Sequence, residues 1–398
     1  MRPVTISVDG EWWDSLLYMG RWYLVGLDGS VRVVDWNRLI DSWKLDDDLR
    51  LAMHCAFARS DSLYGDRWKL VFADPSVRAC LQQKFEKLAK RRLIISKDQL
   101  EQYTVAHEDV GFAFPYSDAV TYALGLWVAS PEGLEVADWD EDGRHLTAVG
   151  ERVCDTPILS LSPNYGTIAM AAGDEGLFEL SVDRRNRPPR QTLSTHCSSC
   201  DWLYYSVYAS SHQAHGTLAA YTSTPAGVDE ATGRKKYERV FQDAVDDRAI
   251  FGDSNGGYSW GSADKICKVD KNGIRVTRYA PGAREPSDQF VDAGQVKAPA
   301  SALCPVDGSV AHYGIVVESD DALTVLRSDG KKYESRGAPT NWRTFQRSKW
   351  YVNHLHVIHS KRVDIVSFNH DFFVNQTSKI AGIRFRERGD PRPRVARR

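Results

Sequence analysis

The sequence contains no long hydrophobic run. No stretch approaches the roughly 18 consecutive apolar residues that a membrane-spanning helix needs. The first residues, MRPVTISVDGEWW, also lack the basic segment and following apolar segment of a secretory leader. We therefore expect a soluble protein that is not exported.

Cysteine is sparse as well. The 398 residues include seven cysteines, an odd number that is spread along the chain. Small secreted domains are instead held together by a dense framework of disulfides. We expect reduced cysteines and a cytoplasmic location.

Common catalytic motifs are missing. The sequence has no Gly-x-Ser-x-Gly nucleophile motif. Gly252–Gly257, GDSNGG, lacks the Lys-Ser or Lys-Thr ending of a phosphate-binding loop, and the acidic segment Asp138–Asp142 does not match an EF-hand loop. These absences leave no catalytic residue, no metal site and no cofactor to assign, so we expect a protein that is not an enzyme.

An excess of charge of either sign is absent too, because the formal net charge is −2. Any attraction to nucleic acid or to an anionic membrane must therefore come from local clusters. The tail from Arg384 to Arg398 is one such cluster, with seven arginines and two prolines, and we expect it to be extended. The other cluster lies on an expected helix, and its residues are our candidate partner-binding site: Lys84, Lys87, Lys90, Arg91 and Arg92.

One pattern of cysteines and histidines approximates a zinc finger. Cys197-x2-Cys200 precedes His212-x2-His215. Residues 201–210 are expected to form one strand, which would hold the two pairs about 30 Å apart. We therefore favour reduced, semi-buried cysteines, while zinc binding by these four residues stays open.

A group of histidines follows near the end of the chain: His354, His356, His359 and His370. In a strand, the first two would face the same way and the third the opposite way. No acidic residue lies beside the first three at a suggestive spacing, the nearest being Asp364, and we interpret the group as ordinary half-exposed histidines.

Aromatic residues are abundant, with 12 Trp and 17 Tyr, which favours β-structure. The clearest segment is Arg21–Trp36, RWYLVGLDGSVRVVDW, which predicts two apolar strands joined by a tight turn. From Val110 onward, short alternating segments of this kind follow one another between turn residues. The chain is therefore predicted to be built mainly from β-hairpins.

The hairpin pattern repeats along the chain. Tyr23–Trp36 matches Leu126–Trp139 in turn position, strand length and closing Asp-Trp pair, and Ile168–Val182 keeps all but that ending. From the turn near residue 133 onward, the turn centres follow at intervals of roughly 40 to 57 residues, near the length of a four-stranded propeller blade. The first interval is longer because it contains the expected helical insertion. Weaker copies are Ile266–Tyr279, Ile315–Ser328 and Leu355–Phe368.

The repeat interval and the endings Asp35-Trp36 and Asp138-Trp139 resemble the WD40-like β-propeller superfamily. We predict an all-β fold, a single β-propeller of about seven four-stranded blades with a small helical insertion after the first blade. Val4–Ser7 is expected to close the ring by pairing with Phe372–Val374 or Lys379–Phe385. The alternative is two packed β-sandwiches with a small α/β segment between them.

Four segments are predicted: a first blade with the ring-closing strand (1–43), a mixed α/β insertion (44–105), the remaining blades (106–380) and a basic, disordered tail (381–398). Leu45–Ala58 is expected to be helical, and Asp74-Pro75 is expected to begin a second helix. We expect the insertion to be separable, so that a chain without residues 44–100 still folds.

The resemblance implies a non-enzymatic scaffold that mediates protein–protein interactions in an intracellular complex. The insertion and the hairpin tip Thr222–Lys236 are the expected specificity elements, because loops on a rigid frame carry recognition. Two alternatives remain: a metal-dependent hydrolase-type enzyme that uses the propeller channel, and a nucleic-acid-associated subunit that contacts phosphate through the basic helix and the Arg-rich tail. No membrane partner is expected.

Overall fold

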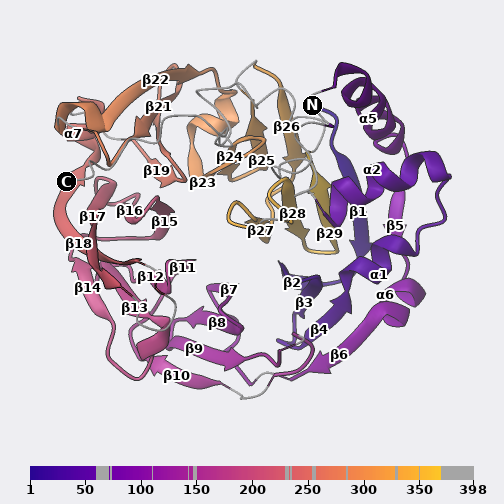
Figure 1. Ribbon diagram of the computed structural model, residues 1–398, viewed down its shortest axis with the longest axis horizontal. Coiled ribbons are helices and arrows are strands. Elements are labelled where there is room, and N and C mark those ends of the chain that lie inside the picture. The colour runs from indigo at the N-terminus through magenta and orange to yellow at the C-terminus, as the bar shows by residue number, and fades with distance from the viewer. Residues whose placement is uncertain are drawn as a thin grey trace.

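The strands form a ring of seven sheets, the blades of a β-propeller (Figure 1). The computed structural model describes residues 1–368 except 60–70, 72–73, 110, 142, 147–149, 229–232, 234, 253–256, 284–285, 328–329 and 349. In each blade the first strand lies nearest the ring axis and its neighbours follow outward. The predicted propeller of seven blades is confirmed, and the alternative of two sandwiches is wrong.

We number the blades from the first one that the chain completes, and the strands of blades 1 to 4 are as follows. Blade 1 contains β2 (Trp12–Tyr18), β3 (Arg21–Gly26), β4 (Val31–Asp35) and β6 (Thr104–Glu108). Blade 2 contains β7 (Asp118–Tyr122), β8 (Gly125–Ser130), β9 (Gly133–Asp138) and β10 (Glu151–Cys154). Blade 3 contains β11 (Ser160–Asn164), β12 (Thr167–Ala171), β13 (Leu177–Ser181) and β14 (Arg190–Leu193). Blade 4 contains β15 (Ser199–Leu203), β16 (Ser206–Ser210), β17 (Thr217–Val228) and β18 (Lys235–Asp246).

Blades 5 to 7 complete the ring. Blade 5 contains β19 (Ser259–Ser262), β20 (Lys265–Asp270), β21 (Gly273–Tyr279) and β22 (Phe290–Val296). Blade 6 contains β23 (Pro305–Ala311), β24 (Gly314–Ser319), β25 (Ala322–Leu326) and β26 (Lys332–Arg336). Blade 7 contains β27 (Asn341–Thr344), β28 (His354–His359), β29 (Arg362–Ser367) and β1 (Val4–Asp9), with β5 (Leu93–Ile95) as a fifth strand.

The second strand of blade 2 and the third strand of blade 6 are buried because they pack between neighbouring blades. Every residue of β8 and of β25 is buried. The residue after the third strand then binds back to the first hairpin of its own blade: the backbone N–H of Trp36 donates to Gly20 O (3.1 Å), and that of Trp139 donates to Leu124 O (2.7 Å). Both tryptophans are buried, so the repeated Asp-Trp ending is a packing feature of the blade.

The N-terminal strand closes the ring, as the sequence predicts. β1 pairs antiparallel with β29, from Val4 opposite Ser367 to Asp9 opposite Arg362, and its other edge pairs in parallel with β5. The predicted partners Phe372–Val374 and Lys379–Phe385 are wrong, because both edges of β1 are already occupied. Those two segments lie outside the described residues.

The helical insertion connects β4 to β6, the third and fourth strands of blade 1. It contains α1 (Trp36–Asp41), α2 (Asp47–Phe57), α5 (Pro75–Leu88), β5 and α6 (Lys97–Tyr103). Asp74 caps α5 by accepting from the backbone N–H groups of Ser76 and Val77, and Pro75 follows at the first helical position, as predicted. The predicted helix at Leu45–Ala58 corresponds to α2.

The insertion shares a hydrophobic core with the ring, so the expectation that it is separable is wrong. Trp36, Phe57 and Phe85 are fully buried in one cluster with residues of β1, β3 and β29. The carbonyl oxygen of Ala56, near the end of α2, accepts hydrogen bonds from His354 Nε2 and Ser367 Oγ of blade 7, both at 2.8 Å. Deleting the insertion would expose this core and remove β5 from the edge of β1.

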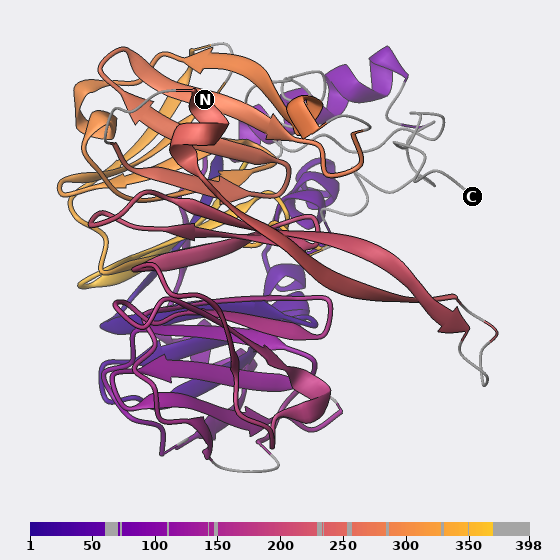
Figure 2. The same ribbon diagram turned by 90° about the vertical axis from the view of Figure 1, so that its left-hand side faces the viewer.

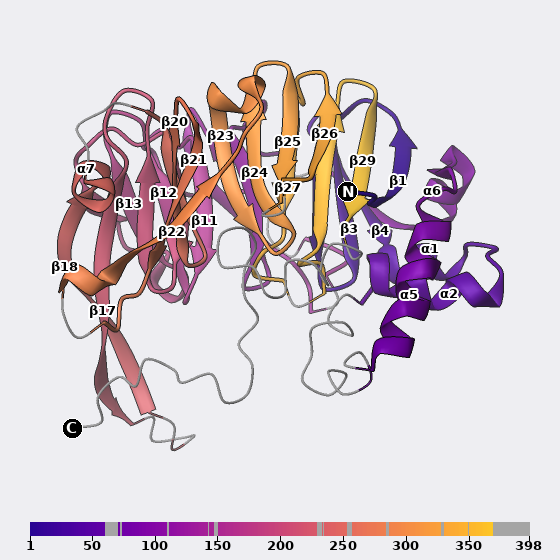
Figure 3. The same cartoon turned by 90° about the horizontal axis from the view of Figure 1, so that it is seen from above.

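Blade 4 carries a long hairpin that extends beyond the ring (Figures 2 and 3). β17 and β18 have 12 residues each, whereas β16 pairs only with Thr217–Ala219 of β17. We call the described residues of 222–240 the arm. The predicted specificity element Thr222–Lys236 lies on it in part, and residues 229–232 and 234 of that segment lie outside the described residues.

Four short helices join the remaining strands: α7 (Asp247–Phe251) and the 3-10 helices η1 (Val182–Arg184), η2 (Pro286–Gln289) and η3 (Ala300–Leu303). None of the helices in the described part of the chain is long and apolar enough to cross a membrane. All seven cysteines lie within the described residues, and none forms a disulfide.

The shared core generates a prediction. Replacing Phe57 by alanine is expected to lower the free energy of unfolding of the whole chain by about 3–5 kcal/mol, because it leaves a cavity between the insertion and blade 7. Leu51→Ala on the same helix is the matched control, since Leu51 is 55% exposed, and it should change stability little. Urea unfolding followed by tryptophan fluorescence measures both. A Phe57→Ala protein as stable as the unchanged chain would contradict the shared core.

Candidate functional site

A cavity of about 1030 Å³ occupies the centre of the ring. It is lined by residues of the first strand of every blade, and these strands surround the axis in Figure 1. Three first strands carry an aspartate at the same register, four residues before their last paired residue: Asp14 in β2, Asp118 in β7 and Asp307 in β23. The repeat therefore directs carboxylates toward the channel from several blades.

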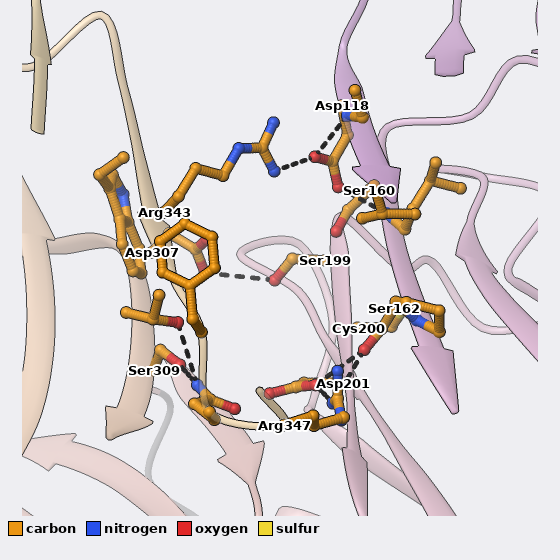
Figure 4. Close-up of a pocket in the computed structure, with 18 of the residues that line it drawn as sticks. Asp118, Ser160, Ser162, Ser199, Cys200, Asp201, Asp307, Ser309, Arg343 and Arg347 are labelled. Atoms are coloured by element: carbon orange, nitrogen blue, oxygen red, sulfur yellow. Dashed lines mark hydrogen bonds and ion pairs between the residues drawn. The ribbon is translucent and has the colours of Figure 1, made fainter. Parts of the chain in front are cut away.

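Arg343 of β27 joins two of these carboxylates. Its Nε and Nη2 donate to Asp14 Oδ1 and Oδ2 at 2.9 and 2.6 Å, and its Nη1 contacts Asp118, as Figure 4 shows. The side chains are 14%, 0% and 10% exposed, respectively. Burial alone would lower the pKa of Arg343, but the two carboxylates raise it well above its ordinary value. A buried three-membered ion cluster therefore connects blades 7, 1 and 2.

The loop after β27 extends across the channel, and we call its residues Phe345–Ser348 the plug loop. Arg347 contacts Asp201 of β15, and its Nη2 donates to Ser162 Oγ of β11 at 3.1 Å. Gln346 contacts Ser309 of β23 and accepts from Ser262 Oγ of β19 at 2.9 Å. The plug loop thus connects blade 7 to blades 3, 4, 5 and 6, and the contacts of Arg347 are visible in Figure 4.

Asp307 and Glu318 form an acidic pair at the start of blade 6. They lie opposite each other on β23 and β24, so their side chains share one face of the sheet, and both line the cavity. Tyr258 Oη donates to Asp307 at 2.8 Å, and Trp342 Nε1 donates to Glu318 at 2.7 Å. No described lysine or arginine forms an ion pair with either carboxylate. Ser199 Oγ also donates to Asp307 Oδ1 at 3.3 Å, as Figure 4 shows. This arrangement can hold a proton or receive a cationic group.

Burial raises the pKa of both members of this pair. The pKa of Glu318 is raised to about 6, first by burial and further by the charge of Asp307. Burial also raises the pKa of Asp307, against the hydrogen bonds from Tyr258 and Gly308. The channel charges therefore divide into aspartates that arginines neutralise and a pair that takes up protons more readily.

The zinc-like residues are arranged differently from the expectation. Residues 201–210 are not one strand: β15 and β16 form a hairpin that turns at Tyr204 and Tyr205 and places Ser199 opposite Ser210. His212 Nε2 donates to Val306 O at 2.7 Å, and His215 Nδ1 lies 2.9 Å from Asp247 Oδ1.

The cysteines of this pattern, Cys197 and Cys200, are buried, and burial raises the pKa of the Cys197 thiol to about 12. The described residues contain no group of three or more side chains that could hold a metal ion.

The late histidines are more buried than predicted. His354 and His356 share one side of β28, as expected, but both are fully buried, so the interpretation as half-exposed residues is wrong for them. Burial lowers the pKa of His354 to about 4. His359 lies 3.5 Å from Asp364, and His370 lies outside the described residues.

The predicted partner-binding cluster lies on α5 and just after it. Lys84 contacts Asp48 on α2, Lys87 Nζ lies 3.4 Å from Asp48, and Arg91 Nη2 lies 3.4 Å from Asp46. Lys90 and Arg92 are exposed. A role for this cluster in binding a partner stays a prediction, and the Arg-rich tail lies outside the described residues.

Sequence reasoning missed the channel residues. Arg343 and Asp14 are separated by 329 positions, and Arg347 and Asp201 by 146. The signal that could have located some of them is the aspartate that recurs in the first strands of blades 1, 2 and 6.

Comparison with known proteins identifies no family. No protein-family model matches the chain, and no curated protein matches it. Solved β-propellers do match. The WD40 domain of Neurospora crassa Pan2 has a TM-score of 0.45 and 8% identity over 90% of this chain and 89% of that domain. The computationally designed protein Ika8 has a TM-score of 0.44 and 8% identity over 92% of this chain and all of that one. The β-propeller domain of Cps50 (Swd1) from Myceliophteria thermophila has a TM-score of 0.38 and 11% identity over 63% of this chain and 98% of that domain. The propeller fold of this chain rests on its own strand pairings.

Removing the central arginine should be costly. Arg343→Met is expected to lower the free energy of unfolding by about 3–5 kcal/mol, because it leaves Asp14 and Asp118 buried without their cation. Adding Asp14→Asn and Asp118→Asn should restore part of that stability. Arg347→Met is the control, since the Arg347 side chain is 35% exposed and an ion pair of that kind contributes about 1 kcal/mol or less. Urea unfolding that ranked the two arginine variants equally would contradict the assignment.

The acidic pair predicts a pH dependence. The folded pKa of Glu318 lies above its ordinary value of 4.5, so its contribution to stability falls as the pH rises from about 4.5 to 6 and stays low above that. Glu318→Gln keeps an acceptor for Trp342 and should therefore be more stable than the unchanged chain by about 1–2 kcal/mol at pH 7.5, with little difference at pH 4.5. Unfolding curves at several pH values measure this, with Asp320→Asn, at an exposed neighbouring site, as control. An unchanged difference across the range would refute the assigned burial.

Proposed function

We propose that this chain is a non-enzymatic scaffold that holds a protein partner on the arm of blade 4. The observation that carries this proposal is the projection of the arm beyond the ring (Figure 2). Ring closure does not need this extension, because β16 pairs with β17 only as far as Ala219.

The outer part of the arm offers both backbone and side-chain contacts. Beyond Ala220, no described strand pairs with the inner edge of β17, and none pairs with the outer edge of β18. Three large apolar side chains on these strands are exposed: Val228 (57%), Tyr237 (59%) and Val240 (38%). An unpaired strand edge that also displays apolar side chains is a template for adding a strand from another protein.

The root of the arm is fixed to the ring through Arg239. Its guanidinium lies 3.2 and 3.1 Å from the carboxylate oxygens of Glu179 on blade 3, and its Nε donates to Tyr205 O at 2.7 Å. The same group lies over the rings of Tyr221 (4.0 Å) and Trp202 (4.4 Å). A binding element with a fixed root loses less conformational freedom when a partner binds. This rigidity supports a recognition role for the arm.

The channel supports a structural role for the centre of the ring. Arg343 and Arg347 pair their charges with aspartates of other blades, and the plug loop lines the cavity. Recognition at the periphery fits this arrangement better than chemistry in the channel.

Shortening the arm tests the proposal. Ser223 and Arg239 are paired neighbours, so replacing residues 224–238 with Asn-Gly should close a two-residue hairpin and leave the Arg239 contacts intact. Affinity purification from the native source, quantified by mass spectrometry after crosslinking, should recover a partner with the full chain and lose it with the shortened chain. Tyr237→Ser with Val240→Thr is the matched variant that keeps the arm length and should weaken recovery. Equal recovery with the shortened chain would overturn the proposal.

A further inference from the structure

A second surface lies at the end of the ring where the first hairpin of each blade turns. The first and third strands of a blade run in the same direction, so these turns lie at the same end of the ring as the tip of the arm. In blades 1, 2 and 3 the turns expose one apolar side chain each: Met19 (47%), Leu124 (37%) and Tyr165 (57%). Three successive blades thus present apolar groups at one end.

The backbone of these turns is held in an uncommon conformation. Met19, Leu124 and Tyr165 have φ angles of 49°, 61° and 49°, in the left-handed region that residues other than glycine rarely adopt. Tight two-residue hairpins need this conformation. The turns fix the backbone at these positions, so the three apolar side chains stay exposed to solvent.

Tyrosines fix each turn to the preceding blade. Tyr351 Oη of blade 7 accepts from the backbone N–H of Gly20 at 3.1 Å. Tyr18 Oη of blade 1 accepts from that of Leu124 at 3.3 Å, and Tyr122 Oη of blade 2 accepts from that of Gly166 at 2.8 Å. The three turns are therefore linked in series, and their relative positions are set before any partner arrives.

A basic segment lies against the turn of blade 3. The backbone N–H of Val182, the first residue of η1, donates to Gly166 O at 2.9 Å. Arg185 then binds Asp138 of blade 2 through two hydrogen bonds of 2.8 and 2.7 Å, which fixes the segment between blades 2 and 3. Arg184 and Arg187, on either side of it, are exposed, and no carboxylate among the described residues pairs with them. Asp183 is the one acidic residue of the segment 182–190, which contains four arginines.

We propose that Met19, Leu124, Tyr165, Arg184 and Arg187, here called the turn surface, dock an acidic protein segment that carries apolar side chains. This specifies what the scaffold binds, so it rests on the proposed function. The two arginines complement acidic side chains of the partner, and the turns accept its apolar ones. Of the three apolar groups only Tyr165 has a ring on which a nucleotide base could stack, and Met19 and Leu124 are aliphatic, so the surface fits a protein better than a single-stranded nucleic acid.

The test uses the full chain and short fluorescein-labelled probes measured by anisotropy. One peptide combines glutamate with leucine and phenylalanine, a second has lysine in place of glutamate, a third has serine in place of the apolar residues, and a fourth probe is a single-stranded RNA. We expect the first peptide to bind best, with an affinity that falls as salt is raised.

Variants then locate the binding. Arg184→Glu with Arg187→Glu should weaken the first peptide about tenfold or more. Leu124→Asn with Tyr165→Asn should weaken it similarly, since asparagine tolerates the left-handed turn and removes the apolar group. Lys271→Glu with Lys361→Glu makes the same charge change at exposed turns between the second and third strands of blades 5 and 7, and should have no effect. Thermal unfolding of every variant checks that the ring is intact.

Two results would overturn the turn surface: equal binding of the lysine peptide, or binding that neither turn-surface variant weakens. Retention of the RNA through Arg184 and Arg187 would replace it by a nucleic-acid site. The outcomes separate this inference from the scaffold function. If the arm experiment recovers a partner but no peptide binds through the turn surface, the scaffold stands and the turn surface is wrong. If no partner is recovered with any chain and no peptide binds, both fail.

Discussion

Arg343 is the constraint on which the centre of the ring depends. Its guanidinium is buried against Asp14 and Asp118, so the strands that carry the two carboxylates must keep a fixed distance from β27. A buried ion cluster tolerates little displacement, because separating its members leaves uncompensated charge in a poorly solvated space. The plug loop follows directly from β27, so its position depends on where this ion cluster holds β27. The contacts of Gln346 and Arg347 with the far blades therefore depend on the same cluster.

This central cluster also explains where recognition can occur. The channel side chains of blades 1, 2 and 4 are engaged with arginines of blade 7 and have little freedom to rearrange around a ligand. The arm and the turn surface lie instead at the end of the ring where the first hairpin of each blade turns. Backbone hydrogen bonds or ion pairs hold each of them in place. A rigid frame with elements displayed at one end is suited to positioning a partner, since little ordering is needed on binding.

The local sequence pattern predicts the hairpins, but it does not predict the contacts between residues that are far apart in the chain. Tyr23–Trp36 was recognisable because its strands, turn and Asp-Trp ending repeat within the chain, and short-range pairing needs no information from elsewhere. The predicted partner of β1 is wrong because several late segments alternate in the same way and the sequence alone does not choose among them. The structure pairs β1 with Arg362–Ser367. The turn at Tyr204 and Tyr205 was missed because it contains none of the usual turn residues. Burial of His354 depends on α2 packing against it, and burial of His356 depends on its contacts with Ser15 and Phe345. The contacts of Arg343 depend on ring closure, so none of these features has a local signal.

The composition of blade 7 has a consequence for the order of folding. Its strands come from residues 4–9, 93–95 and 341–367, which span almost the whole described chain. β1 is synthesised before β29, and more than 350 residues separate Asp9 from Arg362, its partner in the pairing. One edge of β1 can pair with β5 early in synthesis, whereas its other edge waits for the last described strand. Closure of the ring is therefore a late event.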